Sequence, residues 1–341
     1  MDPVTQGALG AAAAEAIAPR SCTPWAGVLG GLAGMAADLD VLIQSPTDPL
    51  LFLEYHRQVT HALAFIPVGG LLCALVAYPF VRRWLSFGRV YSFCLAGYAT
   101  HGLLDGCTSY GTQLLWPFSN VRVAWNVVSV VDPLVTVPLL ALVVVAAWRR
   151  RPSLARVACG WVLLYLLVGL AQRERAEAFG LSVAAARGHV PVSVAAKPAF
   201  GNLLLWKTFY EYDGAYYVDA VRLGVVPESF AGESVPVLDV RRDLPWLRPG
   251  TTQARDVDRF RWFSDGFLAR DPEHEGRLID VRYSVVPNRI DALWGIEMDP
   301  AAGADAHARF FTSREITPED RTAILRMLGL GGGARPSGGR P

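Results

Sequence analysis

The sequence has little charge for its length. Only 18% of its 341 residues are Asp, Glu, Lys or Arg, whereas 52% are hydrophobic, and the mean hydropathy is +0.27. A soluble domain is nearer a quarter charged, so this composition argues against an ordinary cytosolic enzyme and against a disordered chain. The net charge of +1 argues against a nucleic-acid partner held by bulk positive charge, because such proteins are strongly basic.

Cysteine is also scarce. The five cysteines are odd in number, lie far apart and form no CxxC pair: Cys22, Cys73, Cys94, Cys107 and Cys159. A disulfide framework uses an even number, and a cysteine zinc site uses closely spaced pairs. Neither kind of site fits this sequence.

Long apolar runs are present in the first half of the chain. Four of them approach the roughly 20 residues that a helix needs to cross a bilayer: 62–81, 90–107, 130–148 and 154–172. Two shorter runs precede them, 7–19 and 25–37, and these form either short tilted helices or a re-entrant pair. No basic segment precedes the first run, so a cleaved signal peptide is not expected. We therefore expect a multi-pass membrane protein.

Arginine-rich loops predict the orientation. The loops RRWLSFGR and RRRPSLAR are separated by two predicted spans, so both can lie in the cytoplasm. The last span then carries the C-terminal half to the outer side. That half is predicted to be β-rich, with an Asp213-Gly214 hairpin turn. Strands are expected at 202–212, 216–225, 235–240, 278–286 and 292–298, and helices at 258–267 and 317–328.

Ionisable side chains in the apolar half gather at one predicted membrane face. A charged side chain at membrane depth is costly, so each one is a functional candidate. They lie in the motifs DLD, YHRQVTHAL, THGLLDG and VVDPLV. The residues concerned are Asp38, Asp40, His56, His61, His101, Asp105 and Asp132.

The spacing of these residues suits a metal centre. His101 and Asp105 are four apart in a predicted helix, so they share a face. A bent turn can bring the two histidines of YHRQVTHAL together, and DLD can present two carboxylates to one centre. Imidazole and carboxylate ligands suit zinc, with manganese or iron as alternatives. The surplus of ligands predicts either two ions or one ion with supporting residues and a catalytic carboxylate.

Each motif also has a structural interpretation. Histidines near an interface can be hydrogen-bonded without a ligand role, a His–Asp pair can tie helices together, and DLD can be an ordinary loop. Asp132 and Pro133 can begin a helix as N-cap and first residue, so the cap and ligand interpretations of Asp132 both stay open. The conjunction of three histidines and four aspartates at one face favours the metal centre.

These motifs, with MDPVTQGALGAAAAEAI and WNVVSVVDPL, resemble the membrane-bound metal-dependent hydrolase family, also called the YdjM-like family of LexA-binding, inner-membrane-associated hydrolases. The resemblance covers about residues 1–175. It implies a bacterial inner-membrane protein with a metal centre, and hydrolase activity. Some members have His where this chain has Gln6, whose amide could bind through its carbonyl oxygen or orient a water.

The expected fold is an α-helical polytopic membrane bundle followed by a β-rich (α+β) soluble domain outside the cytoplasm. The bundle, 1–178, has about four full spans and a short N-terminal helical pair. The soluble domain covers 179–329 and a disordered tail covers 330–341.

The expected activity is hydrolysis by a metal-activated water at the outer membrane interface. One or two divalent ions, with zinc the first choice, are held by Asp38, Asp40, His56, His61, His101 and Asp105. Asp132 or one of the DLD carboxylates, Asp38 or Asp40, acts as general base, and Arg57 binds an anionic group of the substrate. A site at the interface favours a membrane lipid or another lipid-linked ester or phosphoester.

The alternative is a non-enzymatic membrane protein, either a metal or ion transporter or a structural or regulatory protein. A transporter needs polar groups across the membrane, yet the middles of 62–81, 130–148 and 154–172 contain no acidic residue or histidine. A structural zinc site is closed, with no open position. This sequence has more candidate ligands than a closed structural site needs, which argues mildly against a structural role.

Overall fold

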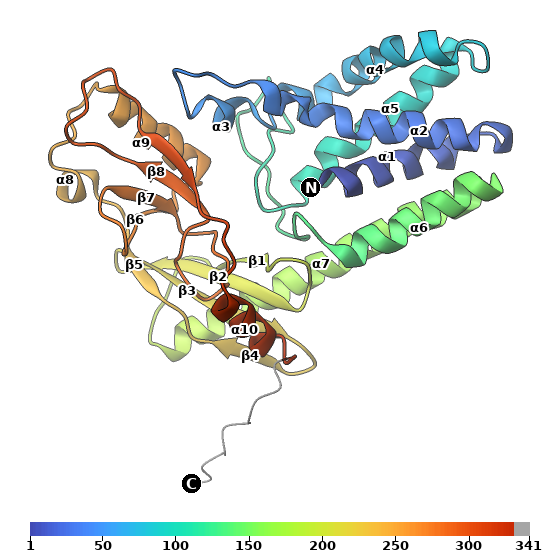
Figure 1. The fold of residues 1–341 in the computed structure, drawn as a ribbon. Coiled ribbons are helices and arrows are strands. Elements are labelled where there is room, and N and C mark those ends of the chain that lie inside the picture. Colours follow the sequence, from blue (N-terminus) through green and yellow to red (C-terminus); the bar gives the residue numbers. More distant parts are fainter. Residues whose placement is uncertain (331–341) are drawn as a thin grey trace. The chain divides into compact units, whose positions relative to one another are not determined.

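The computed structural model describes residues 1–330, which divide into two compact units (Figure 1). The first comprises Met1–Glu174 and Lys197–Leu203, and is helical. The second comprises Arg175–Ala196 and the described residues from Leu204 onward, and contains most of the strands. The predicted disordered tail, apart from Leu330, lies outside the described residues.

The first unit is built from apolar helices, several of which begin with proline at one of their first two positions. The main helices are α1 (Pro3–Ile17), α2 (Thr23–Met35), α3 (Leu51–Tyr55), α4 (Ile66–Val81), α5 (Phe87–Gly106), α6 (Pro133–Arg149) and α7 (Pro152–Ala186). Short 3₁₀ segments connect them: η1 (Arg20–Cys22), η2 (Ala36–Leu42), η3 (Val59–His61) and η4 (Leu63–Phe65). The helix α7 begins in the first unit and ends in the second.

Within residues 1–330, three helical segments are long and apolar enough to cross a membrane. They are Arg20–Leu42, Leu63–Val81 and Pro152–Ala186, and Pro133–Arg149 is a shorter apolar helix. The expected spans 62–81 and 154–172 are therefore confirmed as candidates. The run 25–37 is longer than expected, because η1 and η2 extend α2 to 23 residues.

The expected span 90–107 forms α5 but is not among the three candidates. This helix packs against α1, α2 and α4, so much of its surface is covered by protein. A helix surrounded by other helices can carry polar side chains that a lipid-facing helix would not tolerate.

Glycines allow α5 to approach α2 closely. A Cβ atom at Gly97 would lie 2.1 Å from the carbonyl oxygen of Gly30, so no side chain fits at this point. Small residues of this kind let helix backbones meet within membranes. His101 lies one turn after Gly97, and Gly34 lies one turn after Gly30. The close approach therefore brings the His101 ring to the C-terminal end of α2.

The second unit contains two antiparallel sheets that share a core. The first has the order β1-β2-β3-β4 with β5 paired to β3, and the second has the order β6-β7-β8-β9. Buried Phe209, Val218, Ala269 and Ile279 join the two sheets in one apolar cluster. The strands are β1 (Ala195–Pro198), β2 (Leu205–Tyr212), β3 (Ala215–Leu223), β4 (Pro227–Phe230), β5 (Ser234–Pro236), β6 (Leu268–Arg270), β7 (Arg277–Asp280), β8 (Trp294–Glu297) and β9 (Arg309–Thr312).

The predicted hairpin is confirmed. Tyr212 pairs with Ala215 across Asp213 and Gly214, whose φ angles of 48° and 70° are those of a type I′ turn. The helices of this part are α8 (Val240–Asp243), α9 (Thr252–Phe263) and α10 (Pro318–Met327). Thr317 caps α10 as expected, with Asp320 completing a capping box.

Candidate metal centre

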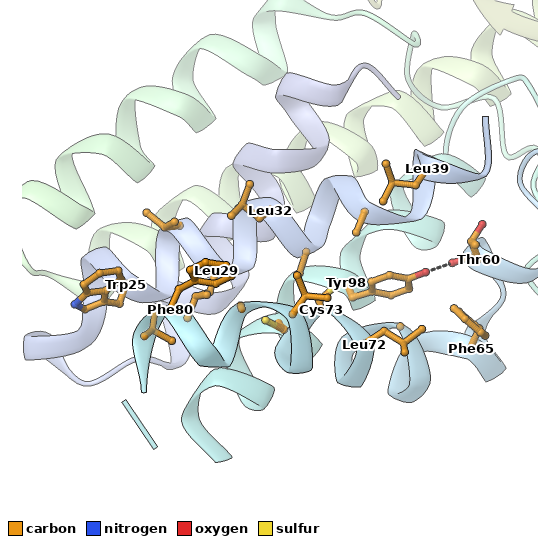
Figure 2. A pocket seen from close by; sticks show the side chains of 18 residues that line it. Trp25, Leu29, Leu32, Leu39, Thr60, Phe65, Leu72, Cys73, Phe80 and Tyr98 are labelled. Carbon is orange, nitrogen blue, oxygen red and sulfur yellow. Dashed lines mark hydrogen bonds between the residues drawn. The ribbon is translucent and has the colours of Figure 1, made fainter. Parts of the chain in front are cut away.

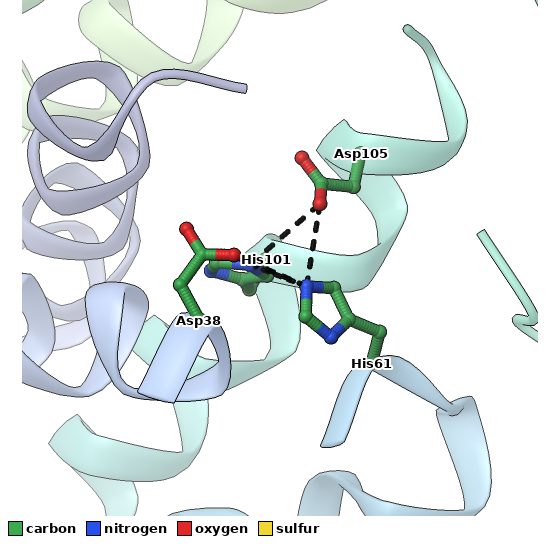
Figure 3. Close-up of side chains that lie close together, drawn as sticks. All are labelled: Asp38, His61, His101 and Asp105. Atoms are coloured by element: carbon green, nitrogen blue, oxygen red, sulfur yellow. Dashed lines mark hydrogen bonds and ion pairs between the residues drawn. The ribbon is translucent and has the colours of Figure 1, made fainter. Parts of the chain in front are cut away.

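Four of the predicted metal ligands meet at one point in the first unit (Figure 3). Asp38 comes from η2, His61 from η3, and His101 and Asp105 from consecutive turns of α5. One ligand atom from each residue lies within 4.8 Å of every other. The side chains of His61, His101 and Asp105 are fully buried, whereas that of Asp38 is 27% exposed.

The spacing of these ligand atoms matches a tetrahedral ion. His61 Nε2 lies 2.9 Å from His101 Nε2, 3.3 Å from Asp105 Oδ2 and 3.4 Å from Asp38 Oδ1. His101 Nε2 lies 3.3 Å from Asp38 Oδ1 and 3.8 Å from Asp105 Oδ2. Bonds of about 2.0–2.1 Å from a tetrahedral zinc separate its ligands by about 3.3 Å. These distances bracket that value, so the group fits one ion.

Neighbouring groups orient both histidines. His101 Nδ1 lies 2.6 Å from the carbonyl oxygen of Gly34, and because a carbonyl only accepts, Nδ1 carries the hydrogen. Nε2 is then left with a lone pair that points into the group. On the other ring, His61 Nδ1 lies 3.2 Å from Asp40 Oδ2 and 3.0 Å from Thr60 Oγ1. Metal-binding histidines commonly hold a carboxylate or carbonyl on the second nitrogen.

Asp105 presents one carboxylate oxygen to the group. Its Oδ1 accepts a 2.8 Å hydrogen bond from Gln6 Nε2 and pairs with the α-amino group of Met1. Its Oδ2 is buried and faces Arg57 Nε at 3.1 Å and His61 Nε2 at 3.3 Å, but no described residue donates a well-aligned hydrogen bond to it. A buried carboxylate oxygen without a well-aligned donor is costly, and a cation at this position would satisfy it. Gln6 therefore orients a ligand through its amide nitrogen.

The electrostatic field at this point favours positive charge. Burial opposes a charged imidazole, but hydrogen bonding to Asp105, Asp38 and Asp40 outweighs it and raises the pKa of His61 to about 10. The same carboxylates would attract a divalent cation.

A second group shares Asp38 with the first. Asp38, Asp40 and His56 also bring their ligand atoms within 4.8 Å of one another. Asp40 is already strongly engaged: Oδ1 lies 2.7 Å from His56 Nδ1, and Oδ2 accepts from Thr60 Oγ1 at 2.7 Å and from the Arg57 amide at 3.0 Å. Asp40 thus holds His56 and His61 in place, and this second group is the candidate position for a second ion.

Arg57 lies inside the centre. Its Nε is 3.1 Å from Asp105 Oδ2, its Nη1 donates to Thr108 Oγ1 at 3.2 Å, and its guanidinium lies 4.6 Å from the Tyr110 ring centre. The backbone of Arg57 has a φ of 66°, a conformation that is uncommon outside glycine. The side chain is buried, so its charge partly balances Asp105 rather than facing open solvent.

Asp132 has the helix-capping role that the sequence left open. Its Oδ1 accepts from the Leu134 amide at 3.1 Å and its Oδ2 accepts from the Tyr165 hydroxyl at 2.7 Å. It belongs to neither group of candidate ligands among the described residues. A catalytic role for Asp132 stays a prediction without a geometric argument.

Sequence reasoning overlooked Glu15. This residue is fully buried in α1, and neither carboxylate oxygen has a hydrogen-bond partner within the described part of the chain. The sequence did contain a signal for Glu15, because it is the one acidic residue inside the apolar run 7–19. It also overlooked Thr60, which touches both Asp40 and His61.

Comparisons with known proteins find a family match over the residues that form most of the helical first unit. Residues 1–176 match the protein family described as YdjM inner membrane protein. The uncharacterized protein YfhP of Bacillus subtilis (strain 168) is 23% identical over 261 residues, covering 74% of this chain and 76% of YfhP. The inner membrane protein YbcI of Escherichia coli (strain K12) is 37% identical over 81 residues, covering 22% of this chain and 44% of YbcI. No solved structure matches the chain.

Proposed function

The chain belongs to the YdjM inner membrane protein family, and on that premise we propose that it is a membrane-bound, metal-dependent hydrolase. The observation that carries the proposal is the close spacing of ligand atoms from Asp38, His61, His101 and Asp105, which includes a buried Asp105 oxygen with no well-aligned hydrogen-bond donor among the described residues. We take zinc as the resident ion, because two imidazoles and carboxylate oxygens at tetrahedral spacing suit it.

The four residues divide into two roles. His61, His101 and Asp105 are fully buried and would hold the ion, since catalytic zinc usually has three protein ligands. A bound divalent ion supplies a water of lowered pKa as the nucleophile. Asp38, on the partly exposed side, would accept the proton that this water loses. We assign the base to Asp38 because the oxygens of Asp40 and Asp132 are already hydrogen-bonded.

The position of the centre supports an amphiphilic substrate. Asp38 lies near the C-terminal end of the candidate span Arg20–Leu42, and His61 lies two residues before the span Leu63–Val81. Both spans therefore place their ligands at the level of a membrane interface. We propose a lipid-linked ester or phosphoester, whose reacting group would lie at that level.

We further propose that the centre faces the outer side of the inner membrane. Arg82, Arg83 and Arg89 lie around the turn between α4 and α5, and Arg149–Arg151 lie at the turn between α6 and α7. Positively charged short loops favour the cytoplasm. The opposite ends of these helices, and the second unit that follows α7, would then lie outside the cytoplasm.

A structural ion is the second candidate function, and one observation favours it. If Asp38 binds the ion together with the other three residues, the tetrahedron is complete and no position remains for water. The ion would then fasten η2, η3 and α5 together without catalysis. Asp38→Asn separates the two cases, as argued below.

The first test is metal content by elemental mass spectrometry on the full-length protein in mild detergent. We expect about one equivalent of zinc, manganese or iron in the wild type, and its loss in His101→Ala and Asp105→Ala. His274→Ala is the matched control, because His274 is an exposed histidine in the second unit that pairs with Asp271. A wild type that holds no ion after incubation with zinc would overturn the proposal.

A further inference from the structure

An apolar groove runs along the first unit and ends beside the candidate metal centre. It is lined by α2, α4 and α5 and encloses about 640 Å³. Figure 2 shows Trp25 and Phe80 at one end, and Leu39, Thr60 and Phe65 at the other. From Trp25 to Leu39 the lining extends about 20 Å, at 1.5 Å per helical residue.

The walls of the groove are hydrocarbon along nearly their whole length. Leucine, valine, alanine and phenylalanine side chains dominate the lining, and Thr60 and Tyr98 are the hydroxyl-bearing members. The rim is open, since Leu32 of α2 and Phe80 of α4 are 59% and 77% exposed. Both helices belong to candidate membrane spans, so the rim opens within the depth of the bilayer. A hydrocarbon chain could therefore enter from the membrane without crossing water.

The two polar lining residues connect the groove to the metal centre. The Tyr98 hydroxyl donates a 2.7 Å hydrogen bond to the Thr60 carbonyl oxygen (Figure 2). Thr60 Oγ1 donates to Asp40 Oδ2 at 2.7 Å and lies 3.0 Å from Nδ1 of the ligand His61. Leu39, at the same end, lies between Asp38 and Asp40 in the chain. The polar end of the groove is thus hydrogen-bonded to residues of the candidate metal centre.

We propose that this groove binds the hydrocarbon chain of a membrane lipid whose ester or phosphoester head group lies at the metal centre. The proposal rests on the proposed function for its head-group end, while the groove supplies the substrate class: a long hydrocarbon chain attached to the reacting group. A flexible chain fits the observations better than a partner helix, because a helix would have no reason to meet a metal centre at one end of its groove.

The test uses vesicles of phosphatidylglycerol and phosphatidylethanolamine that contain a phospholipid with a photoreactive diazirine on its palmitoyl chain. The full-length protein is reconstituted, irradiated and mapped by peptide mass spectrometry. We expect adducts to concentrate on groove-lining residues such as Leu72 and Cys73. Ala77→Trp, which fills the groove from α4, should reduce these adducts at least fivefold. Leu75→Trp is the matched control, because Leu75 is an exposed residue of the same helix outside the groove lining.

Measuring metal content shows whether a loss of adducts reflects a blocked groove or a misfolded protein. It also tests the groove separately from the proposed metal-dependent function. Ala77→Trp should retain the ion, and Cys73→Phe provides a second filling variant if Ala77→Trp loses it. If the wild type forms groove adducts but binds no ion, the proposal that the groove binds a lipid chain is supported and the proposed hydrolase function is overturned. Adducts spread evenly over the outer face of α4, or unchanged by both filling variants, would overturn the groove proposal. Disulfide crosslinking through Cys73 of two copies would also overturn it, because a second copy would then occupy the groove.

Discussion

Asp40 Oδ2 lies 3.2 Å from Nδ1 of His61, on the ring nitrogen opposite the one that faces His101 and Asp105. Under the proposed function, this relationship makes Asp40 a positioning residue for a metal ligand. Its carboxylate would fix the ring so that Nε2 points at the proposed ion, and it would strengthen the ring as an electron donor.

Asp40→Asn should therefore weaken metal affinity by about 10- to 100-fold without abolishing it, since such supporting contacts have effects of that size. Competition with a zinc-sensitive dye measures the affinity. Asp271→Asn is the control, because Asp271 holds the exposed His274 in a similar pair within the second unit. Equal affinities in Asp40→Asn and wild type would contradict the positioning role.

Asp38→Asn should separate metal binding from hydrolysis. If Asp38 is the base, the variant keeps its ion on His61, His101 and Asp105, while the hydrolysis rate falls by about 100-fold or more. A rate that varies with pH in the wild type should lose that dependence in the variant. Loss of the ion in the variant, with no hydrolysis detected in the wild type, would instead identify Asp38 as a fourth ligand and favour the structural site.

Gly97→Ala should destabilise the helical unit and deplete the ion. The added Cβ would lie 2.1 Å from the Gly30 carbonyl oxygen, and overpacking of this kind costs about 1–3 kcal/mol. His101 lies one turn further along, so its ring should be displaced as well. Thermal unfolding and metal content measure both effects. Gly88→Ala is the control on the same helix, because a Cβ there would meet nothing within 4 Å.

Lys207 should make the second unit more stable as pH rises above neutrality. Burial lowers the pKa of Lys207 to about 7, although Asp291, Asp280 and Glu233 partly oppose this. An unfolded lysine has a pKa of about 10.4, so between pH 7 and 10 the unfolded chain binds more protons. The free energy of unfolding should therefore increase with pH, by at most about 1.4 kcal/mol per pH unit.

Near-ultraviolet circular dichroism of the full-length protein, heated at pH 7.5 and pH 9, measures this slope. Lys207→Met should flatten it, because the buried amine and its bonds to Ser284 and the Arg289 carbonyl are removed. Asp291, whose pKa is raised by burial to about 6, titrates below this window. The same slope in Lys207→Met and wild type would refute the assignment.

The proposed orientation predicts labelling from outside the cell. A cysteine at Asp213, in the exposed hairpin turn, should react with a membrane-impermeant maleimide in spheroplasts. A cysteine at Arg83, exposed at the turn between α4 and α5, should react only after the membrane is opened. The reverse pattern would place the metal centre in the cytoplasm.

Local sequence patterns correctly predicted which side chains of one helix lie close together at this point. The pairing of His101 with Asp105 follows from a spacing of four in one helix, and the structure brings them to one point. The hairpin at Asp213 and the cap at Thr317 likewise depend on neighbouring residues alone. In each case the chemistry and the geometry lie within one turn of the chain.

Contacts between segments that are distant in the chain could not be predicted from patterns of neighbouring residues. The sequence grouped His56 with His61, but the bends around η3 direct them to different groups that share Asp38. Arg57 was predicted to bind an anion because it lies beside His56 in the chain; its contact with Asp105 of α5 was not predicted, and its role toward an anion stays a prediction. The run 90–107 was predicted to span the membrane from its length and apolar content, but its packing against α1, α2 and α4 depends on residues far away in the chain.

The candidate ligands are synthesised several seconds apart, because they are far apart in the sequence. Asp38 precedes Asp105 by 67 positions, so at 5–20 residues per second the last ligand follows the first by about 3 to 13 s. During that interval the carboxylates of η2 and the imidazole of η3 have been synthesised, but the α5 residues that meet them have not. If the protein binds an ion as proposed, loading would therefore be a late event in biogenesis that waits for α5, and a defect that delays insertion of α5 would yield metal-free protein even when every ligand is intact.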